Sequence, residues 1–235
     1  MSRSLLSSPG WTPLPQVVAR RIQRMLLDGA LKAGDRIPSQ RILSDQFKVS
    51  RASLREALLT LETLGLIKTE PGRGTFVAAG RSEPHGALKW RYSDSFAMAD
   101  VFGTRVMLEG QIVESAATAI DQTALAELRI ATDEMERCWA AGDLLANVDA
   151  DLRFHSTIAR CCTNLMLQTL YETVQSLLNE TQRLPIPRTN PSRMNASVAE
   201  HREIIAALEV GDGEAARNAM RRHITNTAVC AGIGL

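Results

Sequence analysis

The sequence predicts a mainly α-helical protein in which a winged helix-turn-helix domain precedes an all-helical bundle. Residues 10–78 follow the order helix, helix, tight turn, helix, hairpin, which is that of a winged helix. From residue 96 onward, apolar residues recur at helical spacing, and no useful length alternates with the period of two typical of strands. A polar, proline-containing stretch separates these parts. We therefore expect domains at 10–78 and 95–232, joined by a linker at 79–94.

The bulk composition is that of a globular chain of one or two domains. It has 235 residues, 45% of them hydrophobic, and no apolar run approaches the ~20 residues that a membrane span needs. The N-terminus has no sustained apolar core and does not resemble a secretory signal. None of the four cysteines forms a C-x-x-C pair, which argues against a disulfide framework or zinc ribbon. We expect a cytoplasmic protein without a membrane partner.

The charges are distributed unevenly between the two parts. Residues 1–80 hold 12 of the 27 Lys and Arg but only 6 of the 26 Asp and Glu, so the remainder of the chain is acidic. A basic N-terminal part favours an anionic partner for that part alone.

Three helices are expected in the first part. Residues 14–28 place apolar side chains at helical spacing, and glycines follow them. A short helix over 39–47 has Ser39 as a suitable N-cap. A longer helix begins after Ser50, a second suitable N-cap, and Gly65 is suited to end it.

The third of these helices carries the residue types of a DNA-recognition helix. Arg51 and Arg55 lie four residues apart and so on one face, with Ser50 and Ser53 near the helix start. A recognition helix presents its first turns to base edges, where basic residues meet phosphates and guanines. Arg41, on the preceding helix, is placed to reach the same surface. These residues predict double-stranded DNA as the partner.

A hairpin is expected to follow the third helix as the wing. Two short strand-like runs, 66–69 and 75–77, flank the turn Pro71-Gly72-Arg73-Gly74. Arg73 lies at the tip between glycines, where an arginine commonly enters a minor groove or contacts a phosphate.

The stretch GDRIPSQRILSDQFKVSRASLREALLTLETLGLIKTEPGRGTFV closely resembles the winged helix of the GntR family of regulators. One departure is Ala52, where many relatives carry a polar residue or proline. A two-headed reader gains from a palindromic operator, so we expect a homodimer. By resemblance, the DNA-contact positions of the family fall at Arg41, Ser50, Arg51, Ser53, Arg55, Gly72 and Arg73.

The second part is expected to form about six helices. Residues 96–120 read as a long first helix, and Asp121 and Asp143 are suitable N-caps for the next two. A fourth helix covers 164–184 and ends at a segment with three prolines. The last two cover 192–211 and 212–232, so this part is long enough to bury a core of its own.

Four side chains of this bundle form a candidate metal site. Asp151 and His155 lie four residues apart on one helical face, which alone allows an ion pair, a catalytic pair or half of a metal site. His201 and His223 also lie near apolar helix faces. Three histidines and one aspartate on three helices suit a divalent metal ion, with zinc as the first candidate and nickel or manganese as alternatives.

The helical part resembles the FCD-type effector domain of the FadR branch of the same family, in its metal-containing variety. The segments DLRFH, EHREI and MRRHI match the three ligand segments of that domain, which implies metal ligation by Asp151, His155, His201 and His223. The segment VFGTRVMLEG matches the one whose arginine meets the carboxylate of the effector, which nominates Arg105. A guanidinium offers a planar fork to a carboxylate, although an ion pair between Arg105 and Glu109 is the alternative.

These features predict a transcriptional regulator that acts as a repressor and whose operator affinity is controlled by a small carboxylate effector. The effector, an organic or sugar acid, would bind beside the metal. Two alternatives remain open: a metal-dependent enzyme that uses the same ligands, and a regulator whose metal is purely structural. The ligand segments carry no known catalytic motif and no clear general base, which favours a protein that is not an enzyme.

Overall fold

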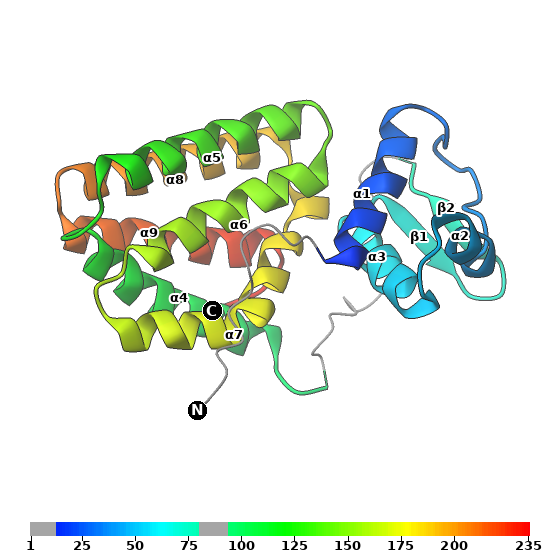
Figure 1. Ribbon diagram of the computed structural model, residues 1–235. Helices are drawn as coiled ribbons and strands as arrows, with labels where there is room; N and C mark the ends of the chain where they lie inside the picture. The colour runs from blue at the N-terminus through cyan, green and yellow to red at the C-terminus, as the bar shows by residue number, and fades with distance from the viewer. Residues whose placement is uncertain (1–12, 80–93) are drawn as a thin grey trace. The chain divides into compact units, whose positions relative to one another are not determined.

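The computed structural model describes residues 13–79 and 94–235, which form two compact units (Figure 1). The first is a winged helix-turn-helix with a two-stranded wing, and the second is an all-helical domain, so the predicted fold class is confirmed. Residues 10–12, His85 and nearly all of the predicted linker lie outside the described residues. The two units are described separately below.

The winged-helix domain is built around its third helix. Both α1 and α2 pack against α3, and the first strand of the wing adjoins its end. Its apolar face is fully covered, with Leu54 and Leu61 completely buried. The elements of this domain are α1 (Leu14–Leu27), α2 (Gln40–Phe47), α3 (Arg51–Thr63), β1 (Ile67–Glu70) and β2 (Gly74–Val77).

Local chemistry sets the ends of these helices where the sequence placed them. The hydroxyl of Ser39 accepts a hydrogen bond from the N–H of Ile42, and that of Ser50 accepts one from the N–H of Ser53 at 3.1 Å. Lys48 ends α2 in the left-handed region at φ 54°, which makes the tight turn into α3. Gly65 follows α3 with φ 70°, which suits a residue without a Cβ.

The wing is an antiparallel hairpin in which Ile67 pairs with Val77 and Glu70 pairs with Gly74. Arg36 forms an isolated bridge with Phe76, so a segment from before α2 lies along the outer edge of the hairpin. The turn passes through Gly72 at φ 74°.

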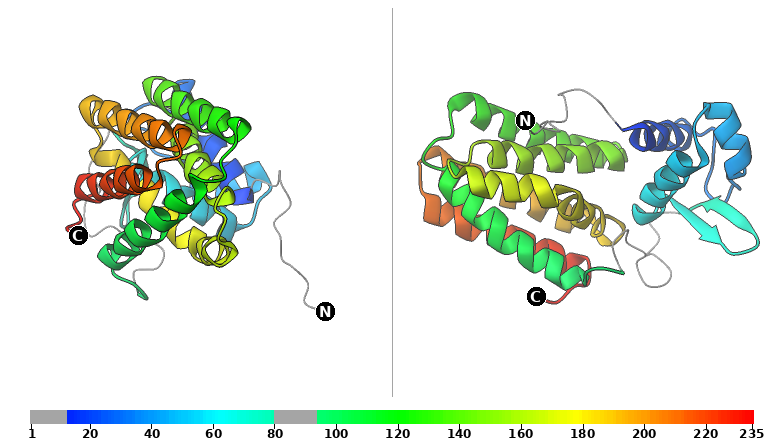
Figure 2. Two further views of the ribbon diagram at one scale, coloured as in Figure 1. Left: turned by 90° about the vertical axis from the view of Figure 1, so that its left-hand side faces the viewer. Right: turned by 60° about the horizontal axis from the view of Figure 1, so that its bottom comes forward.

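Six helices and one short 3₁₀ turn make up the second domain (Figures 1 and 2). The first of them is shorter than the predicted 96–120, because a turn at 117–119 brings the chain to its next N-cap, Asp121. The elements are α4 (Met98–Ala116), α5 (Gln122–Ala140), α6 (Leu144–Arg160), α7 (Leu165–Arg183), η1 (Ile186–Arg188), α8 (Pro191–Glu209) and α9 (Gly213–Cys230).

The packing of the bundle brings α4, α6, α8 and α9 around its interior. Helix α4 packs against α9, α7 and α6, while α5 covers α6 and α8, and α8 also packs against α9. The end-on view in Figure 2 shows these helices side by side around a common centre. Five of the six begin at an Asp or Asn whose side chain accepts a backbone N–H: Asp121, Asp143, Asn164, Asn190 and Asp212.

All four cysteines are free thiols. Cys138 and Cys162 are buried, whereas Cys161 and Cys230 are half-buried. Among residues 13–79 and 94–235, no helix combines the length and the hydropathy that crossing a membrane requires.

Candidate metal centre and nucleic-acid interface

The four side chains predicted to bind a metal meet in the interior of the bundle. Asp151 and His155 come from α6, His201 from α8 and His223 from α9. One donor atom from each lies within 4.8 Å of the donor atoms of the other three. All three imidazole rings are buried, and the aspartate is only slightly exposed. Three helices therefore bring together ligand types that suit a divalent cation.

The Nδ1 atom of each imidazole lies close to an oxygen outside the cluster. The Nδ1 of His201 lies 2.7 Å from the main-chain carbonyl of Ser197. The Nδ1 of His155 lies 2.5 Å from Oε2 of Glu109, and that of His223 lies 2.8 Å from Oε2 of Glu200. An acceptor at Nδ1 favours the tautomer that carries its proton there, which leaves the lone pair of Nε2 free.

The resulting arrangement of lone pairs fits a bound cation. The Nε2 atom of His201 lies 3.1 Å from Oδ1 of Asp151, and that of His155 lies 3.8 Å from the same oxygen. Both Nε2 atoms are buried without a hydrogen-bond partner. Buried acceptors that face one another repel unless a cation lies between them. The Nε2 atoms of the three histidines and Oδ1 of Asp151 together are the kinds of ligand atom that zinc, nickel or manganese binds.

The protonation states of the cluster also suit metal binding. Burial and the neighbouring His201 lower the pKa of His223 to about 4, so this ring is neutral at neutral pH. Burial alone would raise the pKa of Asp151, but its histidine neighbours hold that pKa well below its usual range. A neutral imidazole and an ionised carboxylate are the forms that ligate metals.

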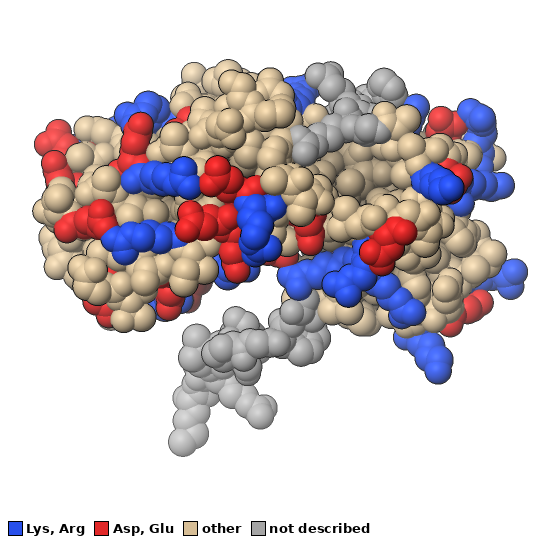
Figure 3. Space-filling model, turned by 90° about the horizontal axis from the view of Figure 1, so that it is seen from above, with Lys and Arg blue, Asp and Glu red and all other residues tan. Residues whose placement is uncertain are grey.

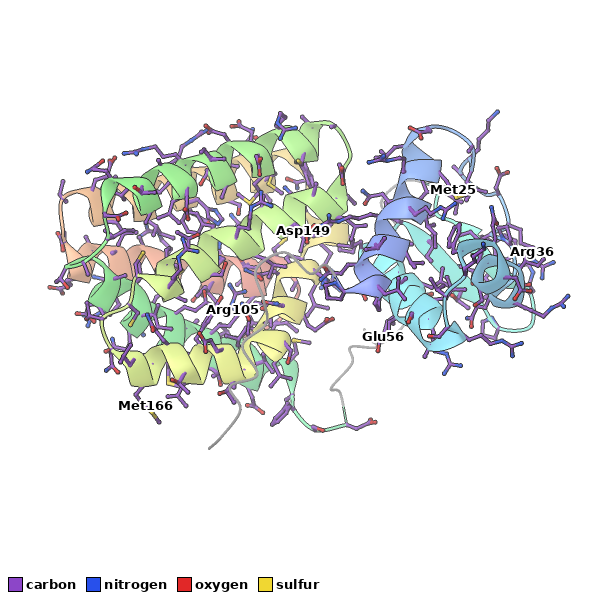
Figure 4. All side chains as sticks on the ribbon, viewed as in Figure 1. Met25, Arg36, Glu56, Arg105, Asp149 and Met166 are labelled. Carbon is purple, nitrogen blue, oxygen red and sulfur yellow. The ribbon has the colours of Figure 1, made fainter. Side chains whose placement is uncertain are left out.

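Arg105 extends from α4 into the interior of the bundle (Figure 4). Its side chain is only 1% exposed, and its Nε donates to Oε1 of Glu109 at 2.7 Å. Its Nη1 donates to the hydroxyl of Thr181 at 2.8 Å, whereas its Nη2 is buried without a hydrogen-bond partner. The ion pair with Glu109 that the sequence allowed is therefore present, yet it leaves one guanidinium nitrogen to bind another group.

A cavity of about 40 Å³ adjoins the cluster and is walled in part by Arg105, Asp151 and His223. Arg193 and Gln182 also line it, and the segment between α7 and α8 contributes Pro185, Ile186 and Thr189. A charged guanidinium and the ligand cluster thus share one small space.

The DNA-contact positions expected from the sequence lie on the winged-helix domain. Arg51 and Arg55 are exposed on the first turns of α3, and Arg41 is exposed on α2. In the described part of the chain, none of these three arginines forms an ion pair. At the tip of the wing, Arg73 is exposed and contacts Glu70. Ser50 and Ser53 are engaged with each other at the start of α3, with their hydroxyls 2.9 Å apart.

A groove runs between the wing and α2, and it contains a basic residue that sequence reasoning missed. Arg36 lines this groove with Ser39, Gly72 and Gly74. Its guanidinium covers Gly74 so closely that a Cβ there would lie 2.8 Å from Nε. Figure 4 shows Arg36 beside α2 and the wing. Its bridge to Phe76 depends on the fold of the hairpin, so the local sequence gave little sign of this placement.

The surfaces of the two domains differ in how their charges are arranged. On the face in Figure 3, acidic and basic side chains of the helical domain lie next to one another. Ion pairs on the surface of this domain include those of Arg202 with Asp133 and Glu136, and that of Arg129 with Glu209. Blue side chains project from several places on the winged-helix domain in the same view, with fewer red ones beside them.

Two family models match this chain. The model described as "Bacterial regulatory proteins, gntR family" matches residues 14–77. The model described as "FCD domain" matches residues 100–226, which is more than half of the chain. The chain belongs to the GntR family. As a GntR-family protein with an FCD domain, it is a DNA-binding transcriptional regulator and not an enzyme.

Named relatives agree with membership of the GntR family. The HTH-type transcriptional regulator LutR of Bacillus subtilis (strain 168) is 33% identical over 213 residues, covering 86% of this chain and 94% of LutR. The Glc operon transcriptional activator of Escherichia coli (strain K12) is 34% identical over 173 residues, covering 70% of this chain and 66% of the activator. The solved structure of E. coli McbR/YncC, 21% identical, has a TM-score of 0.53 and covers 94% of this chain and 98% of that one, a likeness of fold alone.

Two further residues of this GntR-family effector domain were not assigned to the site from the sequence. The sequence indicates Glu109 only as a partner for Arg105, and it assigns no role to Glu200. Each carboxylate instead lies against Nδ1 of a histidine of the cluster. The partner of Glu200 lies 23 residues away, on the next helix, so no local spacing indicated it.

Proposed function

We propose that this regulator senses a small carboxylate bound beside a divalent metal ion in its helical domain, and that this binding changes its affinity for DNA. Asp151, His155, His201 and His223 would hold the metal, with zinc as the first candidate and nickel or manganese as alternatives. Arg105 would bind the carboxylate of an organic or sugar acid.

One observation carries this proposal: a buried, unpartnered guanidinium nitrogen and the metal-ligand cluster border the same small cavity. A buried N–H without an acceptor is costly, and a carboxylate oxygen is the acceptor that a guanidinium binds most strongly. Four protein ligands leave room on a five- or six-coordinate metal for a further oxygen ligand. A small acid that offers its carboxylate to both partners would satisfy the arginine and the metal together.

The DNA-binding half of the proposal rests on the exposed arginines of the winged helix. Arg51 and Arg55 would read base edges and phosphates from α3, with Arg41, Ser50 and Ser53 beside them. Gly72 would let the wing approach the DNA, where Arg73 would contact the minor groove or a phosphate. A homodimer would present two such heads to a palindromic operator.

Repression is the direction that we propose, with the acid releasing the operator. One relative bears the name of an activator, so the direction is a property to be measured for each member separately. Either direction needs only a difference in effector affinity between two states of the regulator, typically worth ~1–3 kcal/mol.

An operator selected from random duplexes provides the decisive experiment. Gel-shift titrations would measure its affinity with zinc alone, with organic and sugar acids alone, and with zinc and each acid together. At least one acid should change operator affinity by ~5- to 150-fold, and only in the presence of the metal. If zinc stabilises the protein but no acid alters operator affinity, the metal is structural and the sensor proposal is wrong.

Arg105→Lys tests the proposed role of the guanidinium. Lysine keeps the charge but has no planar fork, so the response to the acid should weaken while operator affinity without the acid is retained. Arg129→Lys is the matched control, because Arg129 pairs with Glu209 on the exposed surface of the same domain. An unchanged acid response in Arg105→Lys would contradict the assignment.

A further inference from the structure

Two buried glutamates each connect a histidine of the cluster to an arginine of the cavity wall. Glu109 accepts from Nε of Arg105 at 2.7 Å through Oε1, and its Oε2 lies 2.5 Å from Nδ1 of His155. The two carboxylate oxygens of this residue are therefore divided between the guanidinium and the imidazole.

Glu200 repeats the arrangement on the other side of the cluster. Both of its oxygens accept from Arg193, at 2.8 and 2.9 Å, and Oε2 also lies 2.8 Å from Nδ1 of His223. Asn226 donates to the same carboxylate at 2.8 Å. Arg193 and Arg105 come from α8 and α4, and both line the cavity beside the cluster.

Carboxylates outnumber guanidinium groups around the cluster. The three carboxylates are those of Asp151, Glu109 and Glu200, and the two guanidinium groups are those of Arg105 and Arg193. A divalent cation held by the cluster would offset this excess of negative charge and would favour a carboxylate beside it. Interactions of this kind are strong in a buried site because water screens them weakly.

We propose that Glu109 and Glu200 are positioning residues that make the metal and the carboxylate effector bind cooperatively. This inference rests on the proposed function and adds its regulation: the protein responds to the acid only when it is loaded with metal. The two glutamates carry the coupling because each contacts both a metal-ligand histidine and a cavity arginine.

The coupling has a physical route. A cation on Nε2 of His155 would make its Nδ1–H a stronger donor toward the Glu109 carboxylate 2.5 Å away, because it would withdraw electron density from the ring. The carboxylate of Glu109 would then share less of its charge with Arg105, and the guanidinium would attract an incoming carboxylate more strongly. The pair of Glu200 and Arg193 acts in the same way through His223.

The test measures zinc affinity by competition with a chromophoric chelator, in sodium acetate and in sodium chloride at equal ionic strength. Acetate serves as the carboxylate probe. In the wild-type protein, zinc should bind ~5-fold or more tightly in saturating acetate, and without zinc acetate should not shift the melting temperature relative to chloride. Equal zinc affinity in the two salts would overturn the proposal.

Glu109→Gln and Glu200→Gln test the positioning role directly. A glutamine is neutral and offers one acceptor oxygen in place of two, so it weakens the contacts to the arginine and the histidine. Each variant should therefore bind zinc ~10- to 100-fold more weakly and lose the acetate effect. Glu114→Gln is the matched control, because Glu114 is on α4 but pairs with Arg217 outside the cluster. The cobalt absorption spectrum of each of these two variants should differ from that of the wild type, whereas the spectrum of the Glu114→Gln control should not.

The outcomes separate this inference from the proposed function. If His155→Ala combined with His223→Ala still binds zinc like the wild type, the metal site itself is wrongly assigned. If that double variant loses zinc while both glutamine variants keep wild-type zinc affinity and the acetate effect, only the coupling role is wrong. Far-ultraviolet circular dichroism of the metal-free proteins shows which variants fold. If Glu109→Gln does not fold, Glu200→Gln tests the coupling role, because Glu200 is the more exposed of the two glutamates.

Discussion

The two domains of this regulator place their functional charges in opposite environments. Arg55, at the proposed DNA-reading surface, is exposed, and in the described residues it has no ion-pair partner. Arg105, at the proposed sensing site, is 1% exposed and paired with a buried carboxylate. Both are arginines on well-packed helices, so helical structure by itself does not decide the difference.

The difference reflects where the opposing charge comes from. DNA brings its own phosphates, so a reading surface keeps its arginines in water and unpaired until the partner arrives. A buried sensor must carry most of its opposing charge inside, because an unpaired buried ion is unstable. The helical domain accordingly surrounds its cluster with Glu109 and Glu200. When the opposing charges of a buried site are nearly equal in number, the binding of one ion changes its net charge enough to alter what else it binds.

The largest effect should come from removing two of the metal-facing imidazoles. The variant with His155→Ala and His223→Ala should lose the bound metal, and with it the ~3–4 kcal/mol by which zinc at 100 to 1,000 times Kd stabilises the folded protein. Metal analysis and thermal unfolding with and without zinc measure both effects, while operator affinity without effector should stay within a few-fold. Full metal occupancy in this variant would refute the ligand assignment.

A core substitution in the other domain should separate folding from sensing. Leu61 is fully buried on α3, so Leu61→Ala should lower the free energy of unfolding by ~2–5 kcal/mol through lost burial and a cavity. Zinc affinity should not change. Leu27→Ala, at a side chain 48% exposed on α1, is the control and should cost less than ~0.5 kcal/mol. Weaker zinc binding by Leu61→Ala would show that the stability of the winged-helix domain and metal binding by the helical domain are coupled.

The buried charges should make the metal-free helical domain sensitive to acid. Burial opposes ionisation of Glu109, but Arg105 and His155 lower its pKa to about 2, from an ordinary value of 4.5. A lowered folded pKa contributes stability above pH 4.5, and that contribution is lost as the pH falls toward 2. The loss amounts to about 3 kcal/mol, since each pKa unit corresponds to ~1.4 kcal/mol.

Glu109→Gln should therefore flatten the dependence of unfolding free energy on pH between 4.5 and 2. Denaturant titrations of the metal-free protein at several pH values measure the slope. Glu114→Gln should keep the wild-type slope, and a wild-type slope in Glu109→Gln would show that this carboxylate does not control the acid response.

A smaller effect is expected at the DNA surface. Arg55→Ala should weaken operator binding by ~1–3 kcal/mol and relax the base preference, because it removes a side chain placed to contact base edges. Its zinc affinity should equal that of the wild type, since Arg55 lies in the other domain. Arg129→Ala is the control for the loss of a surface arginine. Unchanged operator affinity in Arg55→Ala would remove this residue from the proposed interface.

The smallest effect concerns the N-cap of the recognition helix. Ser50→Ala removes the acceptor for the N–H of Ser53 and should cost ~1 kcal/mol of unfolding free energy. Ser192→Ala, at an exposed position in the first turn of α8, should be nearly neutral. Denaturant unfolding distinguishes the two, and equal stability would show that Ser50 does not stabilise α3.

The elements of the fold followed closely from local sequence signals. The caps at Ser39, Ser50, Asp121 and Asp143 start helices where they were expected, because a short polar side chain satisfies a free backbone N–H wherever it occurs. The end of α4 was placed too late, since residues 117–120 are compatible with either a helix or a turn and the next cap decides between them.

The sequence by itself determined which side chains could meet. The interval of four residues between Asp151 and His155 places them on one face of any helix that contains them, and three histidines in one bundle restricted the choice further. Likewise, the order of helices and hairpin predicted Arg51 and Arg55 as DNA-contact residues from the sequence alone.

Only the tertiary structure decided what each of these side chains faces. The crossing of α4, α6, α8 and α9 brings Glu109 to His155 and Glu200 to His223, and it leaves one nitrogen of Arg105 unpaired beside the cluster. Such contacts join residues up to 76 positions apart, as between Arg105 and Thr181. Periodicity fixes the face of a helix, but the packing of one helix on another fixes the partner, and the charge balance of a buried site depends on that partner.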